Sequence, residues 1–409
     1  MFGIKLTKQN KINTDEKAID KILNRGTIVE TYPTKEDFRE KLLSGERLRF
    51  YIGFDATGST LHLSHAKNFM LLEDFRKLGH EVIVLFGDFT ARIGDPTNKK
   101  ETRGVLSRDE VLKNIEKWKQ QISPLMDFND KVNPPRILNN HDWLSKLTFE
   151  DIISLASNFT VQQMLERNMF DKRIKAGNPI HLHEFLYPLM QGYDSVAMDV
   201  DVELCGTDQT FNALVGRTLL RKLKNKNKFV VVATLMENPK TGKMMSKSEG
   251  RGIFLDTNSE EMFGEVMAEP DEMIEILFTH VTRISLQEIQ TIISGNPKDA
   301  KTKLAEEIVK IFFGDTEAKM ARVNFDKTFS KNRMSNNALR ISVHSGVNIL
   351  DVPFPKEFIK SKNELRRLIE SGAVSSVDSG EKITNTQTKV LNDINLKIGK
   401  HRFIKLNVK

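Results

Sequence analysis

The sequence predicts an α/β protein whose largest domain is a doubly wound parallel sheet covered by helices. Two strand–helix–strand units, each with polar motifs at its strand ends, indicate this fold. The first unit joins apolar strands at 48–54 and 81–86 through a helix that starts near His62 or His65. Such sheets bind ligands at the carboxyl ends of their strands, so we expect the functional site there.

A second unit follows later in the chain. In it, 198–204 alternates with the period of a strand, 209–223 has a helical pattern, and 229–235 is apolar again. Between the two units, about 109–181 is largely helical in pattern, which predicts a helical insertion. The run 224–228 alternates lysine with asparagine and is interpreted as a solvated loop.

The remaining segments predict additional domains, because 409 residues exceed what one compact core holds. The first domain is expected over 1–250, with 1–46 as its helical N-terminal extension. An α-helical domain is expected over 251–335, a polar linker over 336–352, and a small α+β module over 353–409.

Composition favours a cytoplasmic protein that does not enter membranes. The apolar runs are strand-sized, residues 1–30 are mixed and charged, and the single cysteine, Cys205, suits a reducing compartment. Residues 353–409 hold twelve Lys and Arg against six Asp and Glu, although the net charge of the whole chain is only +7. Such a segment favours a polyanionic partner, the alternative being a solvated basic surface without one.

Two short motifs carry most of the expected chemistry. His62 and His65 follow the first strand and the loop 55–60, at a predicted helix N-terminus, where free N–H groups favour phosphate. Imidazoles there can also donate hydrogen bonds to developing charge. The second motif, Met244-Met245-Ser246-Lys247-Ser248, is a loop able to close over a polyphosphate. A lone histidine pair is more often structural, so the interpretation depends on both motifs.

A polar row crosses an otherwise apolar helix. Tyr187, Gln191 and Asp194 lie at i, i+4 and i+7, which places a phenol, an amide and a carboxylate on one helix face. Buried polar groups need partners, and a ligand with an amine and a hydroxyl would supply them. An internal hydrogen-bond network is the alternative.

These motifs resemble the HIGH and KMSKS signatures of class I aminoacyl-tRNA synthetases, and the residues around them resemble tyrosyl-tRNA synthetases of bacterial type. The resemblance implies a Rossmann-like catalytic domain and ATP-dependent activation of L-tyrosine, followed by transfer to tRNA(Tyr). It also implies Mg²⁺ with the ATP and a homodimer with its interface near 147–175. Neither DNA nor membrane is an expected partner.

The resemblance assigns a tyrosine-binding set. Tyr51 and Asp194 would contact the substrate phenol, and Asp95 would hold its ammonium group with Tyr187 and Gln191. A site built to bind the phenol leaves polar groups unpaired when phenylalanine enters, and this family is the standard example of that effect. The full implied set is Tyr51, Thr90, Asp95, Asn140, Tyr187, Gln191, Asp194 and Gln209.

For the nucleotide, the resemblance implies a catalytic set that stabilises the α-phosphate and the departing pyrophosphate. No general base is needed, because the attacking carboxylate is already ionised, and catalysis is then positioning plus charge stabilisation. The implied catalytic residues are Thr57, His62, His65 and Lys247. The implied ATP-binding residues are Gly53, Asp55, Thr57, His62, His65, Gly206, Asp208, Met245, Lys247 and Ser248.

Three residues depart from the family pattern. Ser64 stands where the family has glycine, which usually marks close backbone approach. Met244 occupies the position of the first signature lysine, with Lys243 one residue upstream, and Cys205 replaces a frequent glycine. These differences concern the strength of ATP binding rather than the reaction.

The basic tail resembles a small RNA-binding module shared with a ribosomal small-subunit protein. It would present Lys362, Arg366 and Arg367 from a short helix to RNA phosphates, contacts that position RNA without reading bases. Three rivals remain open: a tryptophanyl or other amino-acid specificity, a degenerate paralogue that only binds RNA, and a nucleotidyltransferase that does not use tRNA.

Overall fold

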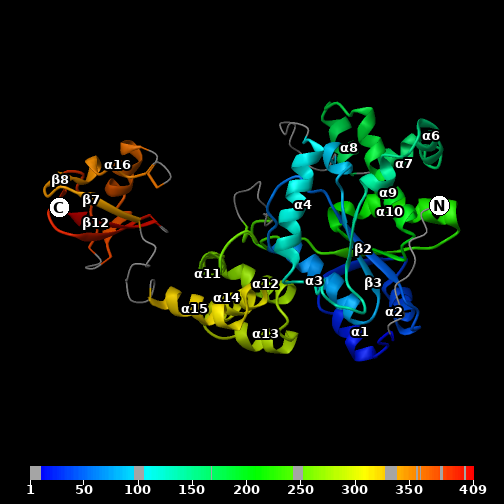
Figure 1. Ribbon diagram of the computed structural model, residues 1–409, viewed down its shortest axis with the longest axis horizontal. Coiled ribbons are helices and arrows are strands. Elements are labelled where there is room, and N and C mark those ends of the chain that lie inside the picture. Colours follow the sequence, from blue (N-terminus) through cyan, green and yellow to red (C-terminus); the bar gives the residue numbers. More distant parts are fainter. Residues whose placement is uncertain are drawn as a thin grey trace. The chain divides into compact units, whose positions relative to one another are not determined.

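The computed structural model describes residues 11–95, 106–166, 168–242, 252–327, 339–355, 358–359, 361–377, 381–399 and 402–409. The chain divides into two compact units (Figure 1). One consists of 1–258 with 265–313, and the other of 259–264 with 314–409.

A six-stranded sheet forms the centre of the first unit, in the order β1-β6-β5-β2-β3-β4. All neighbouring strands are parallel except β1, which runs antiparallel to β6. The chain moves outward from β2 to β4 and then resumes at β5 on the other side of β2. The topological switch point therefore lies between β2 and β5, where sheets of this kind bind ligands. The strands are β1 (Ile28–Tyr32), β2 (Arg49–Phe54), β3 (Glu81–Phe86), β4 (Arg136–Asn139), β5 (Val202–Gly206) and β6 (Phe229–Ala233).

Helices cover this sheet, with α9 and α10 packed against each other. Their close approach requires Gly192, because a Cβ there would lie 2.9 Å from Leu219 Cδ1. The helices that precede β6 are α1 (Glu16–Leu23), α2 (Lys35–Leu43), α3 (Leu63–Lys77), α4 (Arg108–Ile122), α5 (His141–Leu144), α6 (Phe149–Ala156), α7 (Val161–Leu165), α8 (Asn168–Lys175), α9 (Leu186–Met198) and α10 (Thr210–Lys224). After the sheet come α12 (Ile274–Val281), α13 (Leu286–Ile293) and α14 (Pro297–Phe313).

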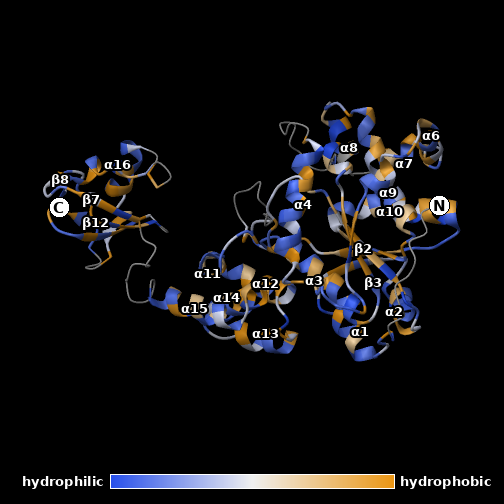
Figure 2. Ribbon diagram, in the orientation of Figure 1, coloured by the Kyte–Doolittle hydropathy of each residue, from blue (hydrophilic) through white to orange (hydrophobic). Residues whose placement is uncertain are grey.

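The core explains why these segments form strands and helices. All six residues of β3 are buried, and the central strands are visibly apolar in Figure 2. Phe50 of β2 stacks on Phe75 of α3 with ring centroids 4.5 Å apart. Burial of such side chains is the main stabilising contribution to this unit.

Three features of the sheet differ from the sequence-based prediction. The expected helical extension 1–46 contains the edge strand β1, and the expected insertion 109–181 contains β4. Both strands are short, so their patterns were too weak to separate from the helices around them. The strand expected over 198–204 begins at Val202, because α9 continues through Met198 and ends at Asp199 in a left-handed conformation (φ 52°).

The second unit contains a helical part and a C-terminal module. The helix α15 (Asp315–Phe325) belongs to this unit, and α11 (Ser259–Ala268) contributes its first residues to it. The module has a four-stranded sheet in the order β7-β12-β11-β9, a two-stranded sheet of β8 and β10, and the helix α16. Its elements are β7 (Leu339–Val343), β8 (Val347–Asn348), α16 (Lys362–Glu370), β9 (Val374–Ser376), β10 (Lys389–Val390), β11 (Ile394–Ile398) and β12 (Arg402–Val408).

The linker expected over 336–352 is wrong for the residues that the structure describes. From Leu339 onward they form β7 and β8, and Ile341, Val343 and Ile349 belong to the core of the module. Polar residues alternate with these apolar ones, and this alternation was interpreted as an irregular linker. The same alternation is typical of a half-buried strand. The module therefore begins before 353.

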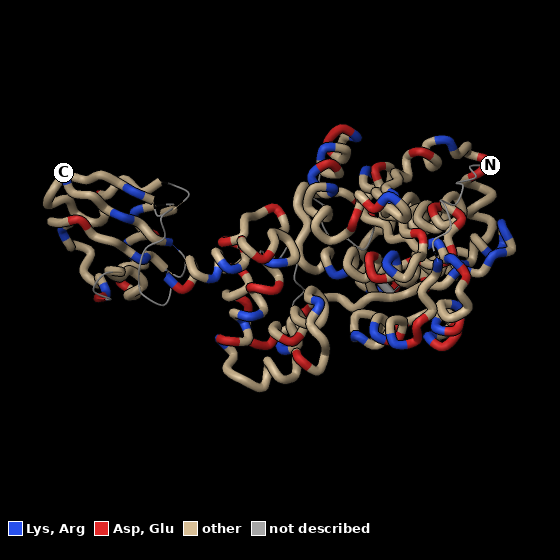
Figure 3. Tube along the Cα trace, turned by 60° about the horizontal axis from the view of Figure 1, so that its bottom comes forward, with Lys and Arg blue, Asp and Glu red and all other residues tan. Residues whose placement is uncertain are grey.

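Figure 3 shows lysines and arginines distributed over this C-terminal module, in line with its basic composition. Across the described ranges, no helix is long and apolar enough to span a membrane.

Candidate active site

Polar side chains converge where β2, β3 and β5 end. Asp55 follows β2 and accepts hydrogen bonds from the Thr90 hydroxyl at 2.6 Å and the Tyr187 phenol at 2.7 Å. This contact ties α9 to the end of β2. Burial raises the pKa of Asp55 to about 6, while both hydrogen bonds oppose that shift. Asp55 was expected on the nucleotide side, and its contacts also join it to the tyrosine-binding set.

Glycine at position 87 makes this approach possible. A Cβ on Gly87 would lie 2.0 Å from Asp55 Oδ1 and 2.3 Å from Thr90 Oγ1, so any side chain would displace both groups. The sequence-based prediction missed Gly87 as a site residue. Its position directly after β3, at a strand end, was the available signal.

Asp194 lies at the centre of a second, fully buried group. It accepts from Trp143 Nε1 at 2.7 Å and from Asn140 Nδ2 at 3.3 Å, and Asn140 also donates to Thr90 Oγ1 at 3.0 Å. Burial raises the pKa of Asp194 well above its ordinary value, and the two donors counteract it. The phenol of Tyr51 lies 3.0 Å from the Ser195 hydroxyl rather than against Asp194.

A chain of amides links the third carboxylate to the same helix. Gln209 Nε2 donates to Asp95 at 2.6 Å, and Asn212 Nδ2 donates to the side-chain oxygens of Gln209 and Gln191, both at 2.9 Å. The eight predicted tyrosine-binding residues thus lie in connected groups, except that no hydrogen bond joins Tyr51 to the other seven directly. Trp143, Ser195 and Asn212 are members that the prediction did not include.

The two histidines lie at the N-terminus of α3 as predicted. His62 is the N-cap residue, its backbone N–H donates to His65 Nδ1 at 3.3 Å, and the two rings are 4.0 Å apart. Burial lowers the pKa of His62 to about 4 and that of His65 well below its ordinary value. Both rings are therefore neutral at pH 7, and His65 keeps its proton on Nε2, where it can donate to a ligand.

The second motif lies outside the described residues, together with Lys243, Met244, Met245, Lys247 and Ser248. The segment that follows it is nevertheless anchored beside the histidines. The Leu63 N–H donates to the Ile253 carbonyl at 3.0 Å, and the Leu255 N–H donates to the Leu61 carbonyl at 2.9 Å. Residues 253 and 255 are thereby held at the start of α3.

The other nucleotide positions differ in exposure. Gly53, Thr57 and Gly206 are partly or fully accessible at the strand ends, and Asp208 is exposed. A Cβ on Gly206 would lie 2.6 Å from Asp208 Oδ1, so a side chain there would displace the exposed Asp208 carboxylate. Cys205, by contrast, is buried in a core cluster with Val230 and Val232. Its departure from the family pattern is therefore a packing difference.

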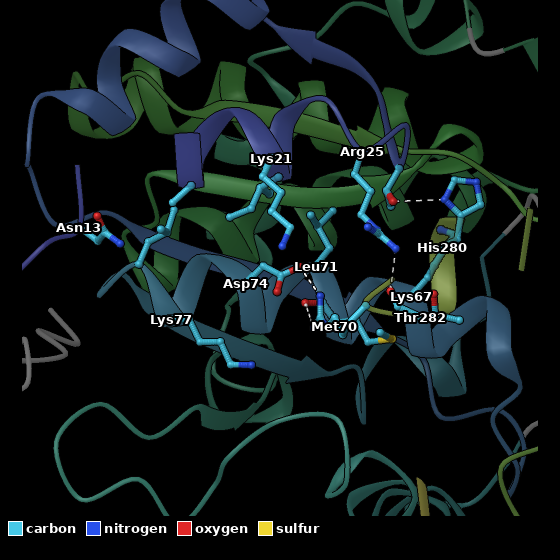
Figure 4. A pocket seen from close by; sticks show the side chains of 15 residues that line it. Asn13, Lys21, Arg25, Lys67, Met70, Leu71, Asp74, Lys77, His280 and Thr282 are labelled. Carbon is cyan, nitrogen blue, oxygen red and sulfur yellow. Dashed lines mark hydrogen bonds and ion pairs between the residues drawn. The ribbon is translucent and has the colours of Figure 1, made fainter. Parts of the chain in front are cut away.

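A cavity of about 290 Å³ lies elsewhere along α3 and is lined by several cations (Figure 4). Arg25 donates to the carbonyls of Phe278, Thr279, Thr282 and Ile284, and Arg283 pairs with Asp74 at 2.5 Å. These arginines already bind protein groups. We therefore interpret the cavity as a structural feature: Arg25 at its wall holds the N-terminal segment to the end of α12. It is separate from the polar groups described above.

The predicted RNA-binding residues lie on α16. Leu365 and Ile369 of this helix are buried, whereas Arg366 and Arg367 are exposed on its other side. Lys362 is exposed too and pairs with Asp351 at 2.6 Å. All three cations are thus exposed to solvent, and Lys362 is also paired with a carboxylate.

No group of three or more His, Cys, Asp or Glu residues able to hold a metal ion occurs in the described part of the chain. Asp55, the carboxylate at the end of β2, is engaged by two protein donors.

Comparison with known proteins shows the family of the chain. Residues 43–330 match the family model of tRNA synthetases class I (W and Y). The chain is 39% identical over 411 residues to a tyrosine–tRNA ligase of Carboxydothermus hydrogenoformans, covering 94% of this chain and 96% of that protein. It is 37% identical over 397 residues to a tyrosine–tRNA ligase of Thermotoga maritima, with 95% and 96% covered.

Solved structures show the same fold. A C-terminally truncated mitochondrial tyrosyl-tRNA synthetase of Aspergillus nidulans superposes with a TM-score of 0.64 at 21% identity, covering 76% of this chain and 94% of that one. The family match over most of the chain and the identity to full-length relatives lead to one conclusion: this chain belongs to the class I tRNA synthetases of the W and Y family.

Proposed function

We propose that the chain is a tyrosine–tRNA ligase, which joins L-tyrosine and ATP into tyrosyl-adenylate and transfers the tyrosyl group to the terminal ribose of tRNA(Tyr). The names of its full-length relatives support this function. The structural observation that carries it is the grouping of Asp55, at the end of β2, with Asp95 and with Asp194 of α9, in the unit that also holds the histidine-capped start of α3.

Each group has a role that follows from its chemistry. Asp194 and Tyr51 bind the substrate phenol. Asp95, Gln191 and Tyr187 bind its ammonium group. Carboxylate and amide oxygens accept hydrogen bonds from the phenol and the ammonium group of tyrosine, whereas phenylalanine would leave the phenol-binding groups buried and unpaired.

We assign the phosphate chemistry to the start of α3 and to the second motif. The tyrosine carboxylate attacks the α-phosphorus and pyrophosphate leaves, so negative charge grows on the phosphate oxygens. The neutral imidazoles of His62 and His65, the Thr57 hydroxyl and the Lys247 ammonium donate to that charge. A Mg²⁺ ion held by the triphosphate would supply neutralisation of its charge.

In the second step the terminal ribose hydroxyl of the tRNA attacks the activated carbonyl, and AMP leaves. The C-terminal module would hold the tRNA through Arg366 and Arg367. We further propose a homodimer that works in the cytoplasm.

The decisive experiment is amino-acid-dependent exchange of pyrophosphate into ATP, with each of the twenty amino acids. We expect exchange with tyrosine alone, which would also show that Ser64 and Met244 are tolerated. Exchange with tryptophan instead of tyrosine would show that tryptophan is the amino-acid substrate. No exchange from a folded protein that binds structured RNA would favour the degenerate RNA-binding paralogue.

A further inference from the structure

A buried ion pair adjoins the proposed tyrosine site. Lys228 lies just before β6 and Glu203 lies in β5, and their side chains are 0% and 2% exposed. The run 224–228 was predicted to be solvated, which is wrong for Lys228. A buried ion pair often stabilises the fold no more than apolar side chains of the same volume would. We therefore expect this pair to have a role other than stability.

Both carboxylate oxygens of Glu203 are used. Oε1 accepts from Gln191 Nε2 at 3.1 Å, and Oε2 accepts from Lys228 and from the Ser195 hydroxyl, the latter at 3.3 Å. Lys228 Nζ also donates to Ser195 Oγ at 2.8 Å. Glu203 is therefore connected to Gln191 directly and to Tyr51 through Ser195.

This arrangement determines which way the Gln191 amide faces. An amide side chain can present either its NH₂ group or its oxygen to a neighbour, but an ionised carboxylate only accepts. Gln191 must therefore direct Nε2 at Glu203 and Oε1 away from it, where Oε1 already accepts from Asn212 at 2.9 Å. A carbonyl oxygen has a second lone pair, which stays available for a cationic donor.

The surrounding helix leaves room for the pair. A Cβ on Gly216 of α10 would lie 2.7 Å from Lys228 Nζ and 2.9 Å from Ser195 Oγ. Glycine at this position is thus a condition for the buried lysine, and a single methyl group there would press on it without removing any polar group.

We propose that the Lys228–Glu203 pair positions the substrate-binding amide: Glu203 holds Gln191 with its oxygen toward the ammonium group of tyrosine, and Lys228 holds the Glu203 carboxylate in place. Both are positioning residues, since neither touches the substrate. The inference rests on the proposed function, in which Gln191 contacts that ammonium group.

The test compares two ligands that differ only in the ammonium group. L-tyrosine and 3-(4-hydroxyphenyl)propanoate share the phenol and the carboxylate, so the ratio of their dissociation constants, measured by calorimetry, reports ammonium recognition. In the neutral double variant Lys228→Met/Glu203→Gln we expect this ratio to fall about tenfold, the effect of losing one oriented hydrogen bond. The kcat of adenylate formation should change far less than the KM for tyrosine.

Two variants serve as comparisons. Ser195→Ala removes the link to Tyr51 and the serine's own bonds to Glu203 and Lys228. It leaves the ion pair and the Glu203–Gln191 bond intact, so the ratio should stay close to the wild-type value. Gly216→Ala should lower the ratio in the same direction as the double variant, and it keeps the test decisive if the double variant fails to fold.

An unchanged ratio in folded Lys228→Met/Glu203→Gln protein would overturn the proposal, as would an equal fall in Ser195→Ala. With the double variant unfolded, an unchanged ratio in Gly216→Ala would overturn it too. A wild-type protein that binds both ligands equally would instead refute the proposed ammonium site itself.

Discussion

The backbone N–H of Leu63 donates to the carbonyl oxygen of Ile253 over 3.0 Å. This bond joins the first residue of α3, next to His62, to a residue that follows the second motif in the sequence. Residues 253 and 255 are thereby held at the helix start that carries the two histidines.

Lys247→Ala should slow adenylate formation about 10²–10³-fold, the usual cost of removing one donor to developing charge. Tyrosine binding should change little, because Lys247 is proposed to act on the phosphates. Rapid-quench measurement of adenylate formation together with the dissociation constant of tyrosine separates the two effects. Lys243→Ala is the matched control, and a larger loss in that variant would transfer the role to Lys243.

His62→Ala should reduce the same rate, and His62→Gln should recover part of it. Burial lowers the pKa of His62 to about 4, so the ring acts as a neutral donor, a role that a glutamine amide can share. The rate should also show no titration of His62 between pH 5.5 and 8. A glutamine variant as slow as the alanine variant would argue against simple hydrogen-bond donation.

Asp194→Asn should weaken selection of tyrosine over phenylalanine, measured as the ratio of kcat/KM values. The variant keeps the volume of the side chain but replaces one acceptor with a donor facing Trp143 or Asn140. Because buried donors left unpaired cost about 1–3 kcal/mol each, the free energy of unfolding should fall by a similar amount. Selectivity equal to that of the wild type would remove Asp194 from phenol recognition.

Asp55 predicts a specific dependence of stability on pH. Its pKa is raised from 3.8 to about 6 in the folded chain, so between these values the folded state binds a proton that the unfolded state lacks. Its contribution to the free energy of unfolding is therefore present below pH 4 and is lost as the pH rises toward 6. Denaturant unfolding of wild type and Asp55→Asn at pH 4.5 and pH 7 should show this loss in the wild type only. An equal loss of stability in the wild type and in Asp55→Asn would show that another titratable group causes the pH dependence.

Removal of 339–409 should leave tyrosine-dependent pyrophosphate exchange largely intact and lower tRNA charging about tenfold or more, because phosphate contacts dominate RNA affinity. The deletion must start at 339, since β7 supplies Ile341 and Val343 to the core of the module. The double variant Arg366→Ala/Arg367→Ala should reproduce part of the loss without removing the fold. An equal loss of pyrophosphate exchange and of tRNA charging would show that the module supports the fold of the catalytic unit rather than tRNA binding.

The elements with the strongest sequence patterns were predicted correctly. The apolar runs at 48–54 and 81–86 form β2 and β3, and His62 caps α3. The strands β1 and β4 were not predicted, because five and four residues carry too little periodicity to stand out beside helices. Lys228 was misplaced for a different reason: a lysine beside asparagines looks solvated unless its buried partner is known.

The amino-acid order alone was enough to predict the local features, namely two histidines at a helix start, a polar row at i, i+4 and i+7, and a basic C-terminal segment. Local spacing and apolar periodicity specify such features, since they depend only on neighbours in the chain. The contacts of Tyr187 with Asp55 and of Lys228 with Glu203 could be found only in the folded chain. Those contacts join residues from different strands and helices, and they form only because the sheet order brings β2, β5 and β6 side by side and removes their polar groups from water.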